Sequence, residues 1–307
     1  MSLTIEKAGA LSLLQDLGRY GFQDIGVTAG GPMDNHAFSW ANKLLDNPEN
    51  ATQIEITVGA FKARFNDATS FSLCGAESVI TLNGERIANW SSHHANSGDL
   101  LEIGYATKGL RSYLSVAGGF SIGKTLNSSS TVIRDKLGGL NQDGQKLQDK
   151  DCIPYAGKVI PFSRRVPACF IGDYKNIVEI GVLPTYQFHE FSPEARNLFF
   201  SGEYTITPYS NRMGYRLAGP AICSEWPGFI SEGIALGAIQ IPNNGQPIIL
   251  MKDRQTIGGY PKIGCVCHKD LSLLAQSPSG TKIRFVLKEL YAAEAQLHIE
   301  MNYFANS

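Results

Sequence analysis

Two arginines and a tyrosine crowd a glycine-containing turn in the second half of the chain. This turn, residues 210–217, holds Arg212, Tyr215 and Arg216. Guanidinium groups bind carboxylate or phosphate through paired hydrogen bonds, and a tyrosine hydroxyl can add a directional one. The spacing alone also fits surface ion pairs beside a core aromatic ring. The turn is therefore a candidate anion-binding element whose role depends on its neighbours.

A polar, glycine-containing run follows the apolar, strand-like residues 248–251. Its polar side chains and glycines are Asp253, Arg254, Gln255, Gly258, Gly259, Tyr260 and Lys262. A strand that ends in this way places a carboxylate, a guanidinium and an amide at one rim, and the glycines allow the backbone to approach a ligand closely. Glu232 and Gln240 lie in short segments between this run and the arginine turn. The pattern predicts a functional loop.

Residues 118–125, Gly-Gly-Phe-Ser-Ile-Gly-Lys-Thr, fit the spacing of a phosphate-binding P-loop. A working P-loop opens a helix whose amides hold the phosphate, but residues 126–131 are poor helix formers. No alternating strand and helix pattern surrounds them. We therefore interpret this match as accidental.

The cysteines and histidines give no metal-site pattern. Cys265 and Cys267 would share one face of a strand while His268 points to the other, which is typical of structural thiols. The other four cysteines are scattered without a CxxC pair. We expect buried thiols and no metal.

Short segments rich in β-branched and aromatic residues, separated by glycine and proline, indicate a mainly β fold. Examples are residues 53–58, 70–74, 79–82 before an Asn83-Gly84 turn, and 112–116. Helical patterns are confined to residues 33–45, 193–200 after a Ser192 cap, 270–276 and 289–296. Helices are thus expected at the periphery of a barrel or sandwich.

The 307 residues are enough for about two domains. We predict a β domain over residues 1–120, a linker or excursion over 121–164, and a second β domain over 165–307 that carries most of the candidate site. A weak repetition relates the halves, for example Arg19-Tyr20-Gly21 and Arg212-Met213-Gly214. Duplication and chance similarity both fit it.

Charge and hydropathy exclude several classes of function. Twenty-seven basic residues against 28 acidic ones give a net charge of -1, which disfavours nucleic-acid and membrane-surface binding. The longest apolar runs are far shorter than the roughly 20 residues of a membrane helix. The first residues lack a signal-peptide pattern, so we expect a cytoplasmic protein.

The chain resembles the family of 5-oxoprolinase C subunits, also called allophanate hydrolase subunit 2 or the biotin-dependent carboxyltransferase family. In the first half the likeness is carried by residues 15–21, 31–34, 55–57 and 109–119. In the second half it is carried by residues 212–217, 231–233, 237–242, 253–256 and 258–262. Asn211 departs from the aspartate usual before Arg-Met-Gly-Tyr-Arg, so this position carries no charge here.

The resemblance implies two β-barrel domains of cyclophilin-like type. It also implies a hetero-oligomer with a homologue of the B subunit and a homologue of the A subunit, the latter of the LamB/YcsF type. The implied activity is ATP-dependent opening of the lactam 5-oxoproline to glutamate, a hydrolase reaction in which ATP would be bound by the complex. The alternatives are biotin-dependent carboxyl transfer to urea and a regulatory protein that binds a kinase inhibitor. The chain lacks a Met-Lys-Met biotin-attachment sequence, which favours the first activity.

A lactam, urea and the ureido ring of biotin are planar amide-like groups whose carbonyl must be polarised. Under the resemblance, Arg212, Arg216, Arg254 and Lys262 would compensate phosphoryl charge, and Asp253 or Glu232 would act as general base. Tyr215, Gln240, Gln255 and Tyr260 would orient the substrate. Gly258 and Gly259 would allow the backbone to approach it.

Overall fold

The computed structural model describes residues 1–223 and 230–305. Its internal contacts divide the chain into two compact units. Unit 1 comprises Met1–Tyr20, Gly30–Asp173 and the residues from Tyr303 onward, and unit 2 comprises Gly21–Ala29 and Tyr174–Asn302. Strands dominate both units, which confirms the predicted mainly β class. The domain boundaries proposed from the sequence stay a prediction.

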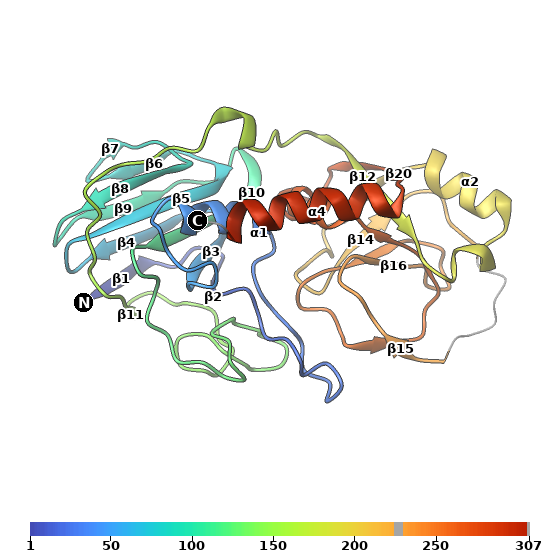
Figure 1. Ribbon diagram of the computed structural model, residues 1–307, viewed down its shortest axis with the longest axis horizontal. Helices are drawn as coiled ribbons and strands as arrows, with labels where there is room; N and C mark the ends of the chain where they lie inside the picture. The colour runs from blue at the N-terminus through green and yellow to red at the C-terminus, as the bar shows by residue number, and fades with distance from the viewer. Residues whose placement is uncertain (224–229, 306–307) are drawn as a thin grey trace. The chain divides into compact units, whose positions relative to one another are not determined.

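Unit 1 is built from two antiparallel sheets (Figure 1). The six-stranded sheet has the order β11-β1-β4-β9-β6-β7, and the five-stranded sheet has the order β2-β3-β10-β5-β8. The strands are β1 (Ser2–Lys7), β2 (Leu11–Gln15), β3 (Gln53–Thr57), β4 (Phe61–Phe65), β5 (Thr69–Glu77), β6 (Ile80–Leu82), β7 (Glu85–Arg86), β8 (Ser91–Ala95), β9 (Leu100–Ile103), β10 (Lys108–Val116) and β11 (Cys152–Pro154).

Alternation of apolar and polar residues explains these strands. In β4, Phe61, Ala63 and Phe65 are buried while the residues between them are half-buried. Phe65 packs on Phe71 of β5 with ring centroids 5.0 Å apart. Asn83 and Gly84 both have positive φ between β6 and β7, which is the turn expected from an Asn-Gly pair.

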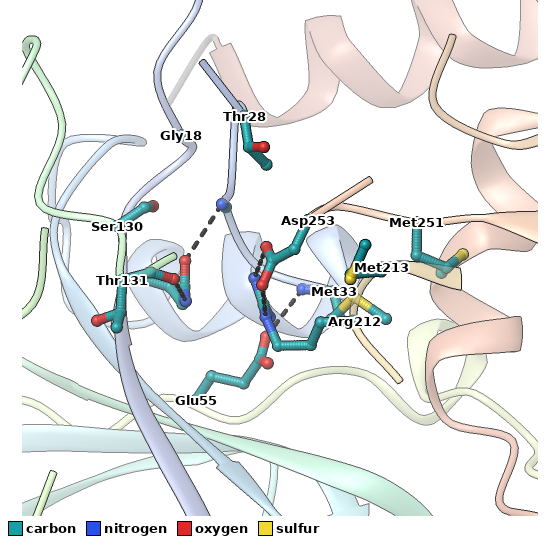
Figure 2. Close-up of polar contacts among 12 residues, drawn as sticks. Gly18, Thr28, Met33, Glu55, Ser130, Thr131, Arg212, Met213, Met251 and Asp253 are labelled. Atoms are coloured by element: carbon teal, nitrogen blue, oxygen red, sulfur yellow. Dashed lines mark hydrogen bonds and ion pairs between the residues drawn. The ribbon is translucent and has the colours of Figure 1, made fainter. Parts of the chain in front are cut away.

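Helix α1 (Asn35–Lys43) covers part of unit 1. It begins two residues later than predicted because Asp34 is its N-cap, with a carboxylate that accepts a hydrogen bond from the Ala37 amide. Just before the helix, the buried Glu55 carboxylate accepts hydrogen bonds from the Met33 amide (Figure 2) and the Tyr113 hydroxyl, both at 2.8 Å. The motif residues 31–34 and 55–57 therefore have a structural task in fixing the start of α1.

A buried cluster that we term the Asp16 cluster fastens residues 128–130 to the end of β2. The Asp16 carboxylate accepts hydrogen bonds from the hydroxyls of Ser128 (2.5 Å) and Ser130 (2.7 Å) and from the amides of Ser129 (2.9 Å) and Gly18 (3.0 Å). All three serines are fully buried. The segment predicted as an excursion thus holds residues packed inside unit 1.

Unit 2 is a closed barrel of seven strands with the order β12-β19-β16-β17-β14-β13-β20 (Figure 1). Its strands are β12 (Ile177–Pro184), β13 (Glu203–Ile206), β14 (Gly214–Ala218), β16 (Ala238–Gln240), β17 (Ile248–Leu250), β19 (Lys262–Val266) and β20 (Lys282–Leu287). A separate two-stranded ladder joins β15 (Glu232–Gly233) to β18 (Ile257–Gly258). The barrel pairs are antiparallel except β12 with β20, which is parallel.

Helices α2 (Pro193–Ser201), α3 (His268–Ala275) and α4 (Leu290–Ala305) accompany the barrel strands in sequence. Ser192 caps α2 as predicted, since its hydroxyl accepts from the Ala195 amide. Helix α4 is longer than predicted and continues through residues with good helix propensity such as Glu300 and Met301. Short 3₁₀ turns occur at Ala168–Phe170 and Phe188–Glu190. Across the described ranges, no helix has the length and apolar character needed to span a bilayer.

Candidate functional site

A groove of about 720 Å³ lies on the outer face of the barrel in unit 2. Strand alternation creates this face: Tyr215 and Leu217 of β14 are buried in the barrel, whereas Arg216 between them is exposed. The groove is lined by β14, β16, β17 and the loops beside them, with the residues Thr207, Tyr209, Asn211, Met213, Gly214, Arg216, Leu217, Ala218, Gln240, Pro242, Asn243, Asn244, Gln246, Pro247, Ile248, Leu250, Gln255 and Tyr260. Polar uncharged side chains therefore dominate its rim.

The strand register aligns several of these side chains in one row across the barrel. Arg216 pairs with Ile248, and Ile248 pairs with Gln240. Gln240 in turn pairs with Lys262 of β19. Because directly opposed residues project from the same face of a sheet, Arg216, Ile248 and Gln240 form a transverse row on the outer face. The register of β16 and β19 shifts between Ile239 and Gln240, so Lys262 continues the row across an irregularity of the ladder. We call it the Arg216–Lys262 row.

Gln240 is the most buried polar residue in this row, with 1% of its surface exposed. Its amide nitrogen has no hydrogen-bond acceptor among the described residues. A Cβ added at Gly258 would lie 3.1 Å from that nitrogen and 3.7 Å from the amide nitrogen of Gln255. Gly258 thus covers the Gln240 amide with backbone alone, and the Gln255 amide lies beside it.

Thr207 provides a second polar group of this kind. It follows β13 and donates its backbone amide to the Arg216 carbonyl at 2.9 Å, so it extends the row beyond Arg216. Its hydroxyl is buried and has no hydrogen-bond partner in the described part of the chain. A buried polar group without a partner costs free energy, and such groups in folded proteins often belong to binding sites.

Glu232 and Lys262 form an ion pair at the far end of the row. The Lys262 side chain is 7% exposed, and that of Glu232 is 34% exposed. Tyr186 donates its hydroxyl to the Glu232 carboxylate, and Gln187 donates its amide to the same carboxylate at 2.9 Å. Gln187 also accepts from the backbone amide of Lys262 at 2.7 Å. We refer to these four residues as the Glu232 network.

This network sets the charge of the carboxylate. Burial raises the pKa of Glu232, but hydrogen bonds from Lys262 and Tyr186, together with the lysine charge, lower it more, and the net pKa lies below the ordinary value. The hydrogen bond between Tyr186 and Glu232 also raises the pKa of the Tyr186 hydroxyl. Glu232 is therefore ionised at neutral pH and can accept hydrogen bonds from a ligand, while its basicity is reduced.

Arg212 and Asp253 face one another away from this network. Arg212 donates from Nε and Nη2 to the two carboxylate oxygens of Asp253, each at 2.8 Å (Figure 2). Both side chains are more than nine-tenths buried. The backbone amide of Asp253 also donates to the Arg212 carbonyl at 2.9 Å. This bidentate pair joins the β13–β14 turn to the end of β17.

Arg254 is turned toward the backbone of its own unit. Its Nε donates to the Ile234 carbonyl at 3.1 Å, and Nη1 donates to the Met251 carbonyl at 3.4 Å. The Arg254 carbonyl in turn accepts from the Thr28 hydroxyl at 3.3 Å. These contacts hold the polar run 252–256 against the segment that leads to β15.

The residues proposed from the sequence therefore fall into separate groups. Four of them, Arg216, Gln240, Gln255 and Tyr260, line the groove. Glu232 and Lys262 form their network, and Gly258 pairs with Glu232 in the β15–β18 ladder. Gly259 follows β18 directly. Tyr215 lies inside the barrel, with its hydroxyl 3.5 Å from the Ala275 carbonyl.

The sequence reasoning missed Thr207, Tyr186 and Gln187. Thr207 follows an ordinary strand, and only the barrel register places it beside Arg216. Tyr186 and Gln187 occur at an irregular turn before the Phe188–Glu190 3₁₀ turn. No motif distinguishes them, and the long-range contact with Glu232 is visible only in the folded chain.

The structure also shows the conformation of the two motifs that the sequence analysis set aside, the P-loop lookalike and the Cys265–His268 segment. Residues 118–134 contain no helix, so the P-loop lookalike lacks the helix N-terminus that binds phosphate. Cys267 is the N-cap of α3, and His268 is the first residue of that helix rather than a strand residue. Cys74 and Cys267 are buried as expected, but the expectation of buried thiols is wrong for the exposed Cys152, Cys169 and Cys223. Among the described residues, no group of three or more His, Cys, Asp or Glu side chains could hold a metal ion.

The groove suits a planar amide better than a polyphosphate. Gln240, Gln255 and Tyr260 offer neutral donors and acceptors, and the described lining contains one charged residue, Arg216. The nearby cations Arg212 and Lys262 are already paired with carboxylates. A triphosphate would need several available cations or a glycine-rich amide cradle. The described lining of the groove therefore does not fit ATP, whereas the neutral ureido group of biotin is compatible with the amide donors.

Comparison with known proteins adds a full-length likeness. Residues 25–287 match the family described as "Carboxyltransferase domain, subdomain A and B". The chain is 35% identical to the C subunit of 5-oxoprolinase from Escherichia coli over 98% of this chain and 96% of that protein. It is 34% identical to the Haemophilus influenzae protein of the same name over 91% of this chain and 89% of that protein.

A solved structure gives the same fold. The chain superposes on the Kluyveromyces lactis urea amidolyase with a TM-score of 0.92 and 25% identity, over 99% of this chain. It spans 20% of the length of that protein. The fold of both units therefore occurs as one part of a much longer polypeptide.

Proposed function

The chain belongs to the family of carboxyltransferase domains with subdomains A and B, and from that premise we propose that it is the C subunit of an ATP-dependent 5-oxoprolinase. The complex would open the lactam 5-oxoproline to glutamate, with homologues of the B subunit and of the LamB/YcsF-type A subunit as partners. The observation that carries this proposal is the 35% identity to a 5-oxoprolinase C subunit over nearly its full length. Its cytoplasmic location is part of the same proposal.

The groove supports a role in binding the lactam. The substrate 5-oxoproline carries an ionised carboxylate beside its lactam, and the lactam itself is neutral and planar, with one acceptor oxygen and one N–H donor. The amides of Gln240 and Gln255 and the hydroxyl of Tyr260 can satisfy both groups. Hydrogen bonds to the carbonyl oxygen would stabilise the negative charge that develops there when a nucleophile attacks.

We assign the polar chemistry of the reaction to the Glu232 network, whose Lys262 pairs with the groove residue Gln240. Lys262 pairs with Gln240 across an irregularity of the β16–β19 ladder, and its ammonium forms the ion pair with the Glu232 carboxylate. It would stabilise negative charge, and the Glu232 carboxylate would accept a proton or orient water. Arg212, Asp253 and Arg254 act as positioning residues in this proposal, because their hydrogen bonds hold the two polar segments in place.

We also propose that a partner protein of the complex, rather than this chain, binds ATP. The cations of this chain near the groove are mostly engaged with carboxylates or carbonyls. Nucleotide binding should therefore persist in a complex from which this chain has been omitted.

Carboxyl transfer is the second candidate function, favoured by the likeness to urea amidolyase and by the compatibility of a ureido ring with the groove.

The test is glutamate formation from 5-oxoproline and ATP by this protein mixed with its A-type and B-type partner proteins, with each component omitted in turn. Turnover should disappear without this chain. Lys262→Met should lower turnover at least tenfold. The matched control is Lys282→Met, which breaks the exposed Lys282–Glu203 ion pair on the same barrel and should leave turnover unchanged.

Two outcomes would contradict the proposal. A stable complex without turnover would oppose the 5-oxoprolinase assignment and favour carboxyl transfer, which is then tested with a biotinylated carrier and urea, or a regulatory protein. Equal activity of the Lys262→Met and Lys282→Met complexes would show that the Glu232 network takes no part in the reaction. That result would not contradict the proposal that this chain is a subunit of the complex.

A further inference from the structure

We propose that the groove binds a cyclic amide that carries an arm ending in an anionic group. This inference rests on the proposed function and specifies the ligand class of the same site. A free lactam would fill only one end of the groove. The argument has three parts, which concern the length of the groove, its charge and its surface between the two ends.

The groove is larger than a small lactam requires. Its volume of about 720 Å³ falls in the range of pockets that enclose drug-sized ligands, roughly 300–1,000 Å³. Along the row, Gln240 and Arg216 are separated by one strand, β17. Neighbouring strands lie about 4.8 Å apart, so the two positions are about 10 Å apart. An extended chain of three residues covers about the same distance.

The two ends of this span differ in charge. Arg216 is exposed and forms no ion pair with the described residues, and it is the one charged residue in the described lining. The buried Thr207 hydroxyl, which has no partner in the described chain, lies at the same end. A guanidinium and a hydroxyl together suit a carboxylate.

The opposite end is neutral and suits an amide. The Gln240 side chain lines the groove, and its amide nitrogen is buried without an acceptor among the described residues. A carbonyl oxygen that enters beside Gly258 would supply that acceptor. Between the two ends lies the half-buried Ile248, which gives the arm of the ligand an apolar surface to pack on.

The test is calorimetric titration of the full chain, repeated on the assembled complex, with three probes. They are pyroglutamyl-alanyl-alanine with a free carboxylate, the same tripeptide with a C-terminal carboxamide, and 5-oxoproline. The free acid should bind at least tenfold more tightly than the carboxamide and more tightly than 5-oxoproline. The difference in affinity between the acid and the carboxamide measures what the anion-binding end contributes, because both probes carry the same lactam.

Variants assign that difference to residues. Arg216→Gln should bind the acid and the carboxamide with equal affinity, and Thr207→Val should reduce the preference for the acid by a smaller factor. The control is Arg284→Gln, which removes another exposed arginine of the barrel, one paired with Glu203, and should keep the full preference. Thermal unfolding of each variant checks that the fold is retained.

Three results would overturn the inference. They are equal binding of acid and carboxamide by the unmodified protein, a preference that survives in Arg216→Gln, and no binding of the tripeptide by either the chain or the complex. These results are separable from failure of the proposed function. A complex that forms glutamate without preferring the acid refutes the two-ended ligand alone, and one that prefers the acid without forming glutamate refutes the reaction alone.

Discussion

In unit 1 the carboxylate of Asp16 accepts four hydrogen bonds, whereas in unit 2 the amide nitrogen of Gln240 donates none to a described residue. Both side chains are buried and both belong to motifs that suggested function. The Asp16 cluster is internally complete, so its polar groups need nothing from outside. The Gln240 amide nitrogen, in contrast, lacks an acceptor among the described residues, and its side chain lines a groove. In this comparison, the buried polar group with all its partners has a structural role, and the one that lacks a partner and also faces a groove is a candidate for ligand binding.

The largest expected effect is the loss of stability on breaking the complete cluster. Asp16→Ala removes the acceptor of two buried serine hydroxyls and two backbone amides. The Ser130 hydroxyl keeps the Asp16 carbonyl as an acceptor at 3.0 Å. The Ser128 hydroxyl and the Ser129 amide would stay buried without an acceptor, so the free energy of unfolding should fall by at least about 3 kcal/mol. Urea unfolding measures it. The exposed Asp24→Ala is the control, with a change under about 0.5 kcal/mol, and a loss below about 1 kcal/mol for Asp16→Ala would contradict our view of the cluster.

The opposite result is expected for the incomplete group. Gln240→Met keeps the length of the side chain and removes an amide that has no partner in the described structure. The free energy of unfolding should stay the same or rise slightly, since no hydrogen bond is lost. Binding of the free-acid pyroglutamyl tripeptide should weaken about tenfold, as measured by calorimetry. A strongly destabilised variant would show that the amide has a structural partner.

A smaller effect is expected where glycine covers the Gln240 amide. In Gly258→Ala the new methyl group would lie 2.7 Å from Cδ1 of Ile234 and 3.1 Å from Nε2 of Gln240. The Ile234 side chain can rotate away, so the stability cost should stay under about 1 kcal/mol. Tripeptide binding should weaken several-fold because the methyl group stands beside the donor. Unchanged affinity would mean that the ligand does not approach Gly258.

The smallest effect is a difference in acid sensitivity. Burial raises the pKa of Asp16, but hydrogen bonds from Ser128, Ser129 and Ser130 outweigh it, and the net pKa is lowered from 3.8. The cluster therefore adds stability above the unfolded-state pKa and loses it as the pH falls through the lower native value. The unfolding free energy of the unmodified protein should drop more steeply below about pH 4 than that of Asp16→Asn. Parallel pH profiles would contradict this assignment.

Local patterns predicted much of the fold. The Asn83-Gly84 turn, the Ser192 cap and the central strand segments follow from short-range rules, and all occur in the structure. The closure of the barrel and the two sheets of unit 1 depend on pairing between strands far apart in sequence. The end of α4 was missed because its weakly polar sequence carries no stop signal near the predicted end.

The candidate site was predictable in composition but not in grouping. Gln240, Gln255, Tyr260 and Arg216 were singled out from residue type, and the groove brings them together. Sequence spacing could not reveal that Arg212 and Asp253 bind each other, since they are 41 positions apart. Nor could it show that Thr207 shares a row with Arg216 and Gln240. That information lies in the strand register, which forms only when the barrel closes.

Because each unit is built from separate stretches of the chain, no single cleavage of the backbone separates the two units. The backbone changes unit after Tyr20, Ala29, Asp173 and Asn302. Cleavage between Asp173 and Tyr174 leaves residues 21–29, which belong to unit 2, on the N-terminal fragment, and leaves the residues from Tyr303, which belong to unit 1, on the C-terminal one. Neither fragment is a self-contained unit. Expression of either half alone would therefore give a truncated fold, and the two halves would have to be made together to complement one another.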